Sequence, residues 1–448
     1  MPTMDVTIEK LIYGGEGLAH HDGSTVFVPF VLPEERVSIS PVEQKKKFVR
    51  ARVEKLLAPS PNRSAAPCPH FGACGGCDYQ HIPYEAQLAF KTEILRETLR
   101  RIGHIEWNGP IAAHASPPWG YRNRAQWKFR TAGSESAAPS SGGGNAFVPL
   151  SIGYFRAKSS TLCPVHECPI LSPVLQSVFA ALRDAAAAAQ FPRALREIEV
   201  FAARPAEQDS ESKLLLTATF AGFPSGADAL AKKIRELVPS IESVVFHDPG
   251  RDKMELFGPG FVEHYAAGRS YRVGHFSFFQ VNDWPTDDLI SHAIGPEASA
   301  DSPQAGGLAL DLFAGVGFFT LPLAGNFTRV IAVESNPAAA RDLEFNVRSQ
   351  ANVEIRAAGV ERFLEKFKER PDFVLLDPPR AGLEASAIAQ LLRIGPRQIT
   401  NVSCEPPTLA RDLAALVAAG YAITELQLFD LFPQTFHMEA VARLRRSR

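Results

Sequence analysis

The stretch that decides the fold is LALDLFAGVG, residues 308–317. Its first five residues have the continuous apolar character of a buried strand, and its glycines would let the backbone approach a ligand closely. A second apolar strand over 330–334 ends on Glu334, where a carboxylate can hold ribose hydroxyls. This pattern suits NAD or S-adenosylmethionine. It lacks the third glycine of the dinucleotide fingerprint, which favours a ligand without a pyrophosphate.

Strands and helices alternate after about residue 305. We expect strands over 308–312, 330–334, 373–377 and 398–402, with helices beginning at Phe318 and Pro337. Such alternation predicts a parallel, doubly wound, Rossmann-like α/β sheet. Ligands bind outside the carboxyl ends of such strands, so Asp377 and Cys404 should face one crevice. Without a ligand, these features would be only a strand-to-helix turn and a turn-initiating Asp before proline.

The rest of the chain divides into two further parts. Residues 1–58 read as short strands and turns that form a small β-barrel. Residues 59–270 form an α+β middle domain, and 131–149 within it read as a mobile loop. The C-terminal domain then spans 271–448. For the middle domain we expect a helix from Tyr84 to Arg101, strands near 150–155, 196–202 and 213–220, and helices near 171–190 and 226–237.

Length and composition are those of an ordinary globular protein. The 448 residues are enough for about two to four domains. No apolar run approaches the ~20 residues of a membrane span, and the first residues lack the features of a signal peptide. We therefore expect a cytoplasmic monomer with no membrane partner.

Local charge says more about partners than the net charge of −2. Basic residues gather over 45–55 and 443–448, and residues 121–130 alternate cations with aromatic side chains. Basic side chains contact phosphates, and aromatic rings stack on unpaired bases. The three runs favour RNA as a partner, with a solvated strand face as the alternative for each run.

A tight group of cysteines follows the predicted barrel. Cys68, Cys74 and Cys77 fall within ten residues, and the fourth ligand would come from Cys163 or Cys168. In a reducing compartment, clustered cysteines more often hold metal than form disulfides. Four thiolates can hold an iron–sulfur cluster or zinc, and the spacing does not separate the two.

The remaining cysteine, Cys404, lies in the run NVSCEPPTLARD, residues 401–412. A free cysteine is by itself most often a small buried hydrophobe. After the glycine-rich turn and the turn at Asp377, however, it suggests a thiolate nucleophile beside a nucleotide-type cofactor. That combination indicates methyl transfer onto a carbon that cannot attack a methyl donor unaided.

The last 170 residues contain five motifs: FFQVN at 278–282, DLFAGVG at 311–317, LDPPRAG at 376–382, VSCEPPTLARD at 402–412 and FPQTFHMEAV at 432–441. Together, and in this order, they resemble the S-adenosylmethionine-dependent RNA uracil-5-methyltransferases. The N-terminal residues 15–37 resemble a TRAM domain, an OB-like RNA-binding barrel found in the ribosomal RNA branch of that family.

The resemblance implies a role for each site residue. A Cys404 thiolate would attack C6 of uracil, and Glu439 would remove the C5 proton so that the thiolate can leave. Asp377 would sit near both the uracil and the cofactor. The family's cofactor positions are matched by Gln280, Phe313, Glu334 and Asp377. The implied substrate is 23S ribosomal RNA, with transfer RNA as the alternative.

The resemblance also implies a [4Fe–4S] cluster, because the ribosomal branch of the family carries one. Its fourth ligand precedes Pro-Ile-Leu, which matches Cys168 and leaves Cys163 spare. The ligands would then be Cys68, Cys74, Cys77 and Cys168.

Two residues depart from the family's pattern near the site. Glu405 stands where the family commonly has Asn, and Phe318 replaces a smaller or polar residue. Two other functions compete with uracil methylation: a non-catalytic iron–sulfur RNA-binding protein and a cytosine-5-methyltransferase. The presence of Cys404, Asp377 and Glu439 together argues against the first, and the Glu439 segment against the second.

Overall fold

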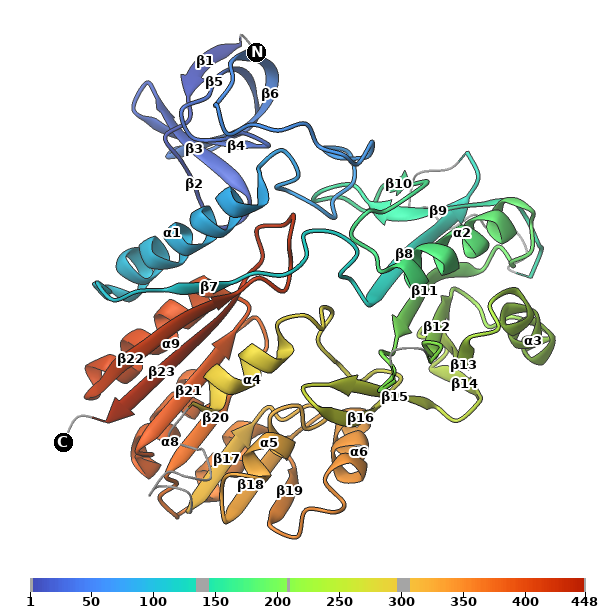
Figure 1. Cartoon of the computed structure of the whole chain (residues 1–448). Coiled ribbons are helices and arrows are strands. Elements are labelled where there is room, and N and C mark those ends of the chain that lie inside the picture. The colour runs from blue at the N-terminus through green and yellow to red at the C-terminus, as the bar shows by residue number, and fades with distance from the viewer. Residues whose placement is uncertain (1–2, 134–144, 208–209, 296–306, 447–448) are drawn as a thin grey trace.

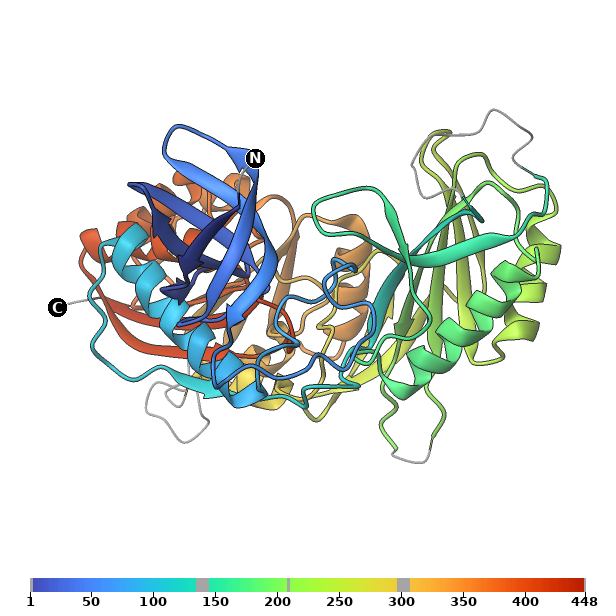
Figure 2. The ribbon, with the colours of Figure 1, turned by 90° about the horizontal axis from the view of Figure 1, so that it is seen from above.

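The computed structural model describes residues 3–133, 145–207, 210–295 and 307–446. These residues form three sheets and a two-stranded ribbon (Figure 1). Seen from above, the N-terminal sheet lies over the C-terminal domain, and the middle sheet lies beside both (Figure 2). The loop expected over 131–149 falls mostly on 134–144, which lie outside the described residues.

The N-terminal sheet has six strands and curls around its own core, in the order β1-β5-β6-β4-β3-β2. Alternate apolar residues point inward, among them Val26, Val28 and Ile39. The backbone amide of Glu9 donates to the carbonyl of Leu18 at 2.8 Å and helps to close the curl. The strands are β1 (Met4–Thr7), β2 (Lys10–Leu11), β3 (Glu16–His21), β4 (Ser24–Pro29), β5 (Arg36–Gln44) and β6 (Phe48–Ala58).

The middle sheet has seven strands in the order β10-β9-β8-β11-β12-β13-β14, and two helices pack on it through one core. Trp127 and Phe179 meet in this core, between β8 and α2, with ring centroids 5.3 Å apart. The elements are β8 (Arg124–Thr131), β9 (Leu150–Phe155), β10 (Leu162–Pro164), β11 (Leu195–Ala202), β12 (Leu214–Phe220), β13 (Ile241–Asp248), β14 (Lys253–Phe257), α2 (Pro173–Ala187) and α3 (Ala227–Leu237). The ribbon β15 (Phe261–Ala266) and β16 (Arg269–Gly274) follows.

The C-terminal sheet has eight strands in the order β19-β18-β17-β20-β21-β23-β22-β7. Its strands are β17 (Leu308–Leu312), β18 (Arg329–Glu334), β19 (Val353–Ala357), β20 (Phe373–Leu376), β21 (Gln398–Ser403), β22 (Tyr421–Phe429), β23 (Glu439–Arg446) and β7 (Ala112–His114). Its helices are α1 (Tyr84–Gly103), α4 (Thr286–Ile294), α5 (Thr320–Ala324), α6 (Pro337–Asn346), α7 (Val360–Lys366), α8 (Ala385–Ile394) and α9 (Pro406–Ala418).

Helices cover both faces of this sheet, as a doubly wound fold requires. Leu308, Leu310 and Leu312 pack with α1, α7, α8 and α9 in one core, whereas Ala309 packs with α4 and α5 in another. The chain runs outward from β17 to β18 and β19, and then returns to β20 on the other side of β17. This reversal opens a crevice at the carboxyl ends of β17 and β20, where such folds bind ligands.

The sheet differs from the expected all-parallel arrangement at one edge. The five strands from β19 to β21 are parallel, but β23 is antiparallel to both of its neighbours. No crossover helix separates β22 from β23, so these strands pair as a hairpin does. The expected start of a helix at Phe318 also moves, because α5 begins at Thr320.

Part of the expected middle domain belongs physically to the C-terminal sheet. Helix α1 packs in the core that contains α9, and β7 pairs with β22 as the edge strand. Lys91 of α1 donates to Asp430, just after β22, at 2.7 Å, and both side chains are fully buried. The barrel is therefore followed by a segment anchored on the C-terminal domain.

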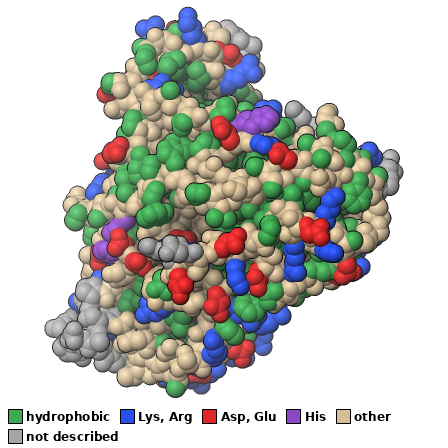
Figure 3. Space-filling view, turned by 45° about the vertical axis from the view of Figure 1, so that its right-hand side comes forward, with side chains coloured by type: hydrophobic (Ala, Val, Ile, Leu, Met, Phe, Trp, Pro, Cys, Tyr) green, Lys and Arg blue, Asp and Glu red, His purple; other side chains and the backbone are tan. Residues whose placement is uncertain are grey.

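The surface carries charge of both signs. Figure 3 shows Lys and Arg interspersed with Asp and Glu over the lower part of one face, with no large patch of a single sign. Among the helices in the described part of the chain, none has the length and apolar character needed to span a membrane.

Candidate active site

A cavity of about 650 Å³ opens at the carboxyl ends of the C-terminal strands. Its lining includes all six residues that the sequence predicts for catalysis and cofactor binding: Gln280, Phe313, Glu334, Asp377, Cys404 and Glu439. The reversal in strand order brings together residues that are up to 159 positions apart in the chain. Phe318, one of the two departures, lines the same cavity, whereas Glu405 does not.

The turn after β17 is shaped by backbone that few residues tolerate. Gly317 has a φ of +93°, and a Cβ there would lie 2.8 Å from Cδ1 of Leu343. Phe313 adopts a φ of +66° although it is not glycine. Left-handed backbone at a large side chain is strained, and such strain persists where the surrounding structure holds it. The turn thereby presents the Phe313 ring to the cavity.

Glu334, at the end of β18, is held by backbone amides. Its carboxylate accepts the Gly315 N–H at 2.8 Å and the Asn336 N–H at 2.6 Å. These two bonds tie the glycine-rich turn to the next strand. Glu334 also lines the cavity, so its carboxylate is available to a ligand there, and its role toward a ribose stays a prediction.

Two carboxyl groups lie close together beneath the crevice. Asp311 is fully buried; its Oδ2 accepts from the Thr320 hydroxyl at 2.5 Å, and its Oδ1 has no hydrogen-bond partner among the described residues. Burial, followed by the charge of Glu334, raises the pKa of Asp311 to about 7. Burial, followed by the charge of Asp311, also raises the pKa of Asp377 to about 7. The site therefore favours proton uptake or a cationic ligand.

Cys404 lies between β21 and α9, on a loop fixed by its own polar groups. The Glu405 amide donates to Oγ of Ser403 at 3.2 Å, and the Thr408 hydroxyl donates to the Glu405 carbonyl at 3.0 Å. Burial raises the pKa of the Cys404 thiol to about 12; the charge of Glu439 also raises it, and the Arg380 guanidinium lowers it. The thiol is thus protonated in the RNA-free protein at neutral pH.

Glu439 is the first residue of β23, and its side chain is buried against the same cavity. Burial, followed by the charge of Asp377, raises its pKa well above the ordinary value, while Arg380 opposes the rise. A carboxyl group with a raised pKa is a stronger base once it is ionised. The pair of Glu439 and Asp377 thus places proton-transfer groups around Cys404.

Sequence reasoning assigns no role to Arg380, His437 or Tyr13, which also belong to this region. Arg380 and His437 line the cavity, and burial lowers the pKa of His437 to about 4. Arg380 lies within the motif LDPPRAG and His437 within FPQTFHMEAV, and these motifs were the sequence signal that could have identified both residues. The Tyr13 hydroxyl donates to Glu405 Oε2 at 2.8 Å, and no pattern in the sequence indicates this contact.

A second cavity, of about 410 Å³, adjoins the first. It is lined by Cys68, Cys74, Cys77 and Cys168, whereas Cys163 is buried in the core of the middle sheet. The two cavities share four lining residues: Arg122, Arg380, Phe432 and His437. Among the described residues, none of these four cysteines forms a disulfide. Within the described residues, no three His, Cys, Asp or Glu side chains are grouped closely enough to hold a metal ion.

The cations of the run 121–130 largely have partners within the protein. Arg124 lies over the Phe201 ring at 4.6 Å, and Arg130 over the Phe155 ring at 5.3 Å. Lys128 forms an ion pair with Glu197 and lines the cysteine cavity. The cations of this run therefore pack against neighbouring side chains of the protein. Arg122 and Lys128 also line the cysteine cavity and make that part of its wall basic.

Two known families match parts of the chain. The family described as tRNA (Uracil-5-)-methyltransferase matches residues 266–447, which include every predicted residue of the first cavity. The TRAM domain family matches residues 2–54, which make up most of the N-terminal sheet.

Relatives match nearly the whole chain. An "Uncharacterized RNA methyltransferase" of Aquifex aeolicus is 33% identical over 98% of this chain and 98% of its own length. The 23S rRNA (uracil(1939)-C(5))-methyltransferase RlmD of Pectobacterium atrosepticum is 32% identical over 98% of this chain and 93% of its own. A solved Pyrococcus abyssi tRNA (uracil-54, C5)-methyltransferase, in complex with S-adenosyl-L-homocysteine, has the same fold. Its TM-score is 0.71 at 24% identity, over 98% of this chain and 100% of that one.

Proposed function

The chain belongs to the RNA uracil-5-methyltransferases, and from that premise we propose that it forms 5-methyluridine in 23S ribosomal RNA through a covalent adduct between Cys404 and uracil C6. One observation carries the proposal: the predicted nucleophile, the predicted base and the predicted cofactor residues line a single cavity. The choice of 23S ribosomal RNA rests on the whole-chain relatives named RlmD.

Cys404 supplies what uracil itself lacks. C5 of uracil is a weak carbon nucleophile, and addition of the Cys404 thiolate to C6 converts the ring into an enolate that is nucleophilic at C5. Burial raises the pKa of the thiol, so its proton must first pass to solvent before the thiolate can add to C6. The Arg380 guanidinium lowers the pKa of the thiol and so favours the thiolate. Arg380 and Arg122 both line the cavity that contains Cys404.

S-adenosylmethionine, when bound, supplies an electrophilic methyl group. Gln280, Phe313, Glu334 and Asp377 would hold it, and the acidic surroundings fit its cationic sulfonium. After C5 has gained its substituent, Glu439 removes the C5 proton, and the Cys404 thiolate leaves C6. The product is 5-methyluridine and the enzyme's thiolate is regenerated.

The target base must leave its stack to reach Cys404. A base that undergoes chemistry inside a pocket is turned out of the helix or taken from a single strand. Phe432 and His437 line both cavities and so offer faces on which an extruded nucleotide could stack. The family's RNA substrate therefore enters across the wall that the two cavities share.

The test of substrate is a methylation assay with purified protein and S-adenosylmethionine. We expect 5-methyluridine at one uridine of a 23S ribosomal RNA transcript and little in transfer RNA, measured by nuclease mapping and mass spectrometry. Methylation of transfer RNA alone would overturn the choice of substrate while leaving the reaction in place. The absence of 5-methyluridine from both RNAs would overturn the reaction.

We propose that Cys68, Cys74, Cys77 and Cys168 hold a [4Fe–4S] cluster. The four thiols line one cavity, which supports the proposal, and four thiolates can hold such a cluster or a zinc ion. The preference for the cluster over zinc rests on the resemblance to the ribosomal RNA branch of the family. The cluster has a structural role, because the proposed methyl transfer involves no net electron transfer.

Anaerobic purification tests the cluster. We expect brown protein with about four irons and four sulfides per chain. Cys168→Ser should lose the iron, and the matched variant Cys163→Ser should keep it, because Cys163 is buried away from the cavity. Stoichiometric zinc without iron would refute the cluster. Loss of iron in Cys163→Ser with retention in Cys168→Ser would show that the fourth ligand is wrong.

A further inference from the structure

The N-terminal barrel reaches the wall of the active site through one loop. Tyr13 lies between β2 and β3, and its ring packs edge-on against Phe436 with centroids 5.3 Å apart. Gly15, in the same loop, has a φ of +82°, and a Cβ there would lie 3.1 Å from both Asp78 and Phe436. The loop is thus seated closely against the segment that leads to Glu439.

The contact ends on the residue next to the proposed nucleophile. The Tyr13 hydroxyl donates to Glu405 Oε2 at 2.8 Å. Glu405 occupies the N-cap position of α9, but its side chain makes no capping hydrogen bond there. The carboxylate therefore faces the barrel and not the start of its own helix.

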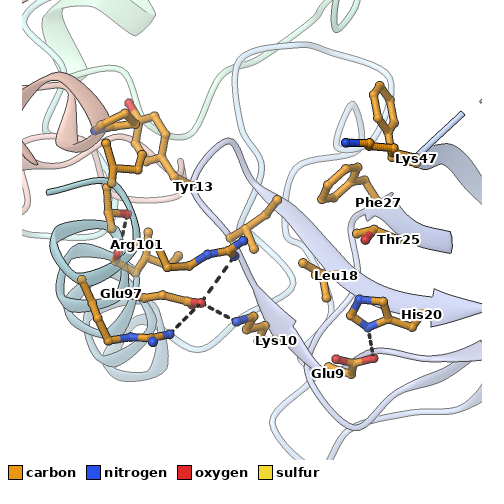
Figure 4. A pocket seen from close by; sticks show the side chains of 17 residues that line it. Glu9, Lys10, Tyr13, Leu18, His20, Thr25, Phe27, Lys47, Glu97 and Arg101 are labelled. Atoms are coloured by element: carbon orange, nitrogen blue, oxygen red, sulfur yellow. Dashed lines mark hydrogen bonds and ion pairs between the residues drawn. The ribbon is translucent and has the colours of Figure 1, made fainter. Parts of the chain in front are cut away.

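Glu405 stands between two cavities. Cys404 lines the active-site cavity, whereas Tyr13 and Pro407 line a cavity of about 810 Å³ between the barrel and α1. In Figure 4, Tyr13 and Arg101 lie across this cavity from Phe27 and His20 of the barrel. The ion pair of Lys10 with Glu97 joins the barrel to α1 along the same cavity.

We propose that Tyr13 is a positioning residue for the transfer site: it holds the Glu405 carboxylate on the side of the barrel and so keeps that negative charge away from the Cys404 sulfur. The inference rests on the proposed function, because it concerns the same nucleophile. It gives the barrel a part in the chemistry in addition to any contact with RNA.

The charges around Cys404 explain why this matters. Glu439 on β23, Asp377 after β20 and Glu405 on its own loop all disfavour the thiolate, and Arg380 favours it. Glu405 has the weakest effect of the three carboxylates although it is the next residue in the chain. Its bond to Tyr13 fixes the carboxylate on the side of the barrel. A carboxylate released from Tyr13 could approach the sulfur and make the thiol harder to ionise.

The test compares four proteins with the wild type: Tyr13→Phe, Glu405→Gln, the double variant, and Tyr421→Phe as a matched control. Tyr13→Phe keeps the ring against Phe436 and removes only the hydroxyl. Tyr421→Phe removes a hydroxyl that donates to the Pro396 carbonyl at 2.7 Å, away from the cavity. The first readout is the rate of Cys404 alkylation by iodoacetamide in RNA-free protein across a pH series, followed by mass spectrometry of the Cys404 peptide. The second is the pH profile of kcat/KM for methylation.

We expect Tyr13→Phe to move the alkylation profile of Cys404 upward by about half to one pH unit, which lowers the thiolate fraction about three- to tenfold at a given pH. The ascending limb of the kcat/KM profile, along which the Cys404 thiol loses its proton, should move in the same direction. In the Glu405→Gln background, Tyr13→Phe should have little further effect, since no charge remains to be held. The Tyr421→Phe profile should match the wild type.

Two results would overturn the inference: an unshifted Cys404 profile in Tyr13→Phe, or a shift that persists in the Glu405→Gln background. Alkylation is measured without RNA or cofactor, so its outcome is independent of whether 5-methyluridine is formed. Failure of the proposed function would appear instead as wild-type protein that methylates neither RNA.

Discussion

At the scale of single residues, the protonation states of three carboxyl groups decide what the candidate site can do. Glu439, Asp377 and Asp311 are carboxyl groups whose pKa values are raised, first by burial and then by a neighbouring carboxylate. In the proposed reaction one group must accept the C5 proton. Glu439 is buried, and its charge raises the pKa of Cys404 more than that of any other carboxylate does. This position supports the proposal that Glu439 is the base.

Glu439→Gln should separate methyl transfer from product release. Glutamine keeps the size of the side chain and cannot take the C5 proton, so the thiolate cannot leave C6. We expect a covalent RNA–protein adduct to accumulate, seen as a shifted band on denaturing gels, with turnover reduced about 10²-fold or more. Turnover at the wild-type rate without any adduct would mean that another group takes the proton.

Asp311 should make stability depend on pH in a definite direction. Its folded pKa of about 7 lies above the ordinary 3.8, so the folded protein holds a proton that the unfolded chain has released. Its contribution to stability is present below about pH 4 and is lost as the pH rises through about 7. We expect Asp311→Asn to gain stability relative to the wild type from pH 4 to pH 8, on the order of 1–3 kcal/mol.

The measurement is urea denaturation of both proteins at several pH values without cofactor. Buried histidines such as His275 and His437 titrate in the opposite sense, with pKa values lowered to about 4. The difference between variant and wild type removes their effect, since both proteins contain them. A difference that stays constant from pH 4 to pH 8 would contradict a raised pKa at Asp311.

Motif-based reasoning works for individual residues when the chemistry is local to a motif. Asp377 and Cys404 each follow a strand at the carboxyl edge of the sheet, so their convergence on one cavity could be predicted. The place of Glu439 at the same cavity could be expected only from the family resemblance. The bond between Tyr13 and Glu405 joins residues 392 positions apart, on different domains. No periodicity or spacing encodes such a contact, because it depends on how the domains dock.

At the scale of elements, one buried ion pair ties α1 to the C-terminal sheet. Lys91 Nζ donates to Asp430 at 2.7 Å and to the Phe432 carbonyl at 3.1 Å. Burial lowers the pKa of Lys91, and the charge of Asp430 opposes that shift. Both charges are removed from water, and the attraction between them offsets the hydration that each has lost.

Lys91→Met should therefore destabilise the fold strongly, because it leaves Asp430 buried and unpaired. We expect the free energy of unfolding in urea to fall by about 3–5 kcal/mol, and Asp430→Asn in the same protein to restore much of the loss. The exposed pair of Lys232 and Glu236 is the matched control, and Lys232→Met should change stability by less than about 1 kcal/mol. A loss in Lys91→Met no larger than in the control would show that the pair does not hold α1 in place.

Most elements could be predicted because their periodicity or apolar character is strong. The helix expected from Tyr84 to Arg101 is α1, and the strand expected over 308–312 is β17. The three-residue strand β7 could not be predicted, since its pairing partner β22 lies more than 300 positions away. The sequence analysis predicted no strands over the residues of β22 and β23, so it also missed the antiparallel edge that they form.

At the scale of the whole molecule, the active site is assembled from more than the cofactor-binding sheet. The C-terminal domain supplies Cys404 and Glu439, the segment before the middle sheet supplies Arg122, and Tyr13 of the barrel contacts Glu405, the residue next to Cys404. The three sheets could be expected from the sequence, but their arrangement depends on contacts such as Lys91 with Asp430 and Lys10 with Glu97. Such contacts carry no local sequence signal.

The most direct test of the account is 5-methyluridine in 23S ribosomal RNA, mapped by mass spectrometry in a strain that lacks the gene. The strain is complemented with the wild-type protein or with Cys404→Ala, a variant that keeps the cofactor-binding residues but lacks the thiol that activates C5. We predict that one 5-methyluridine disappears on deletion, returns with the wild-type protein and does not return with Cys404→Ala. An unchanged pattern of 5-methyluridine in the deletion strain, or its full restoration by Cys404→Ala, would contradict the account.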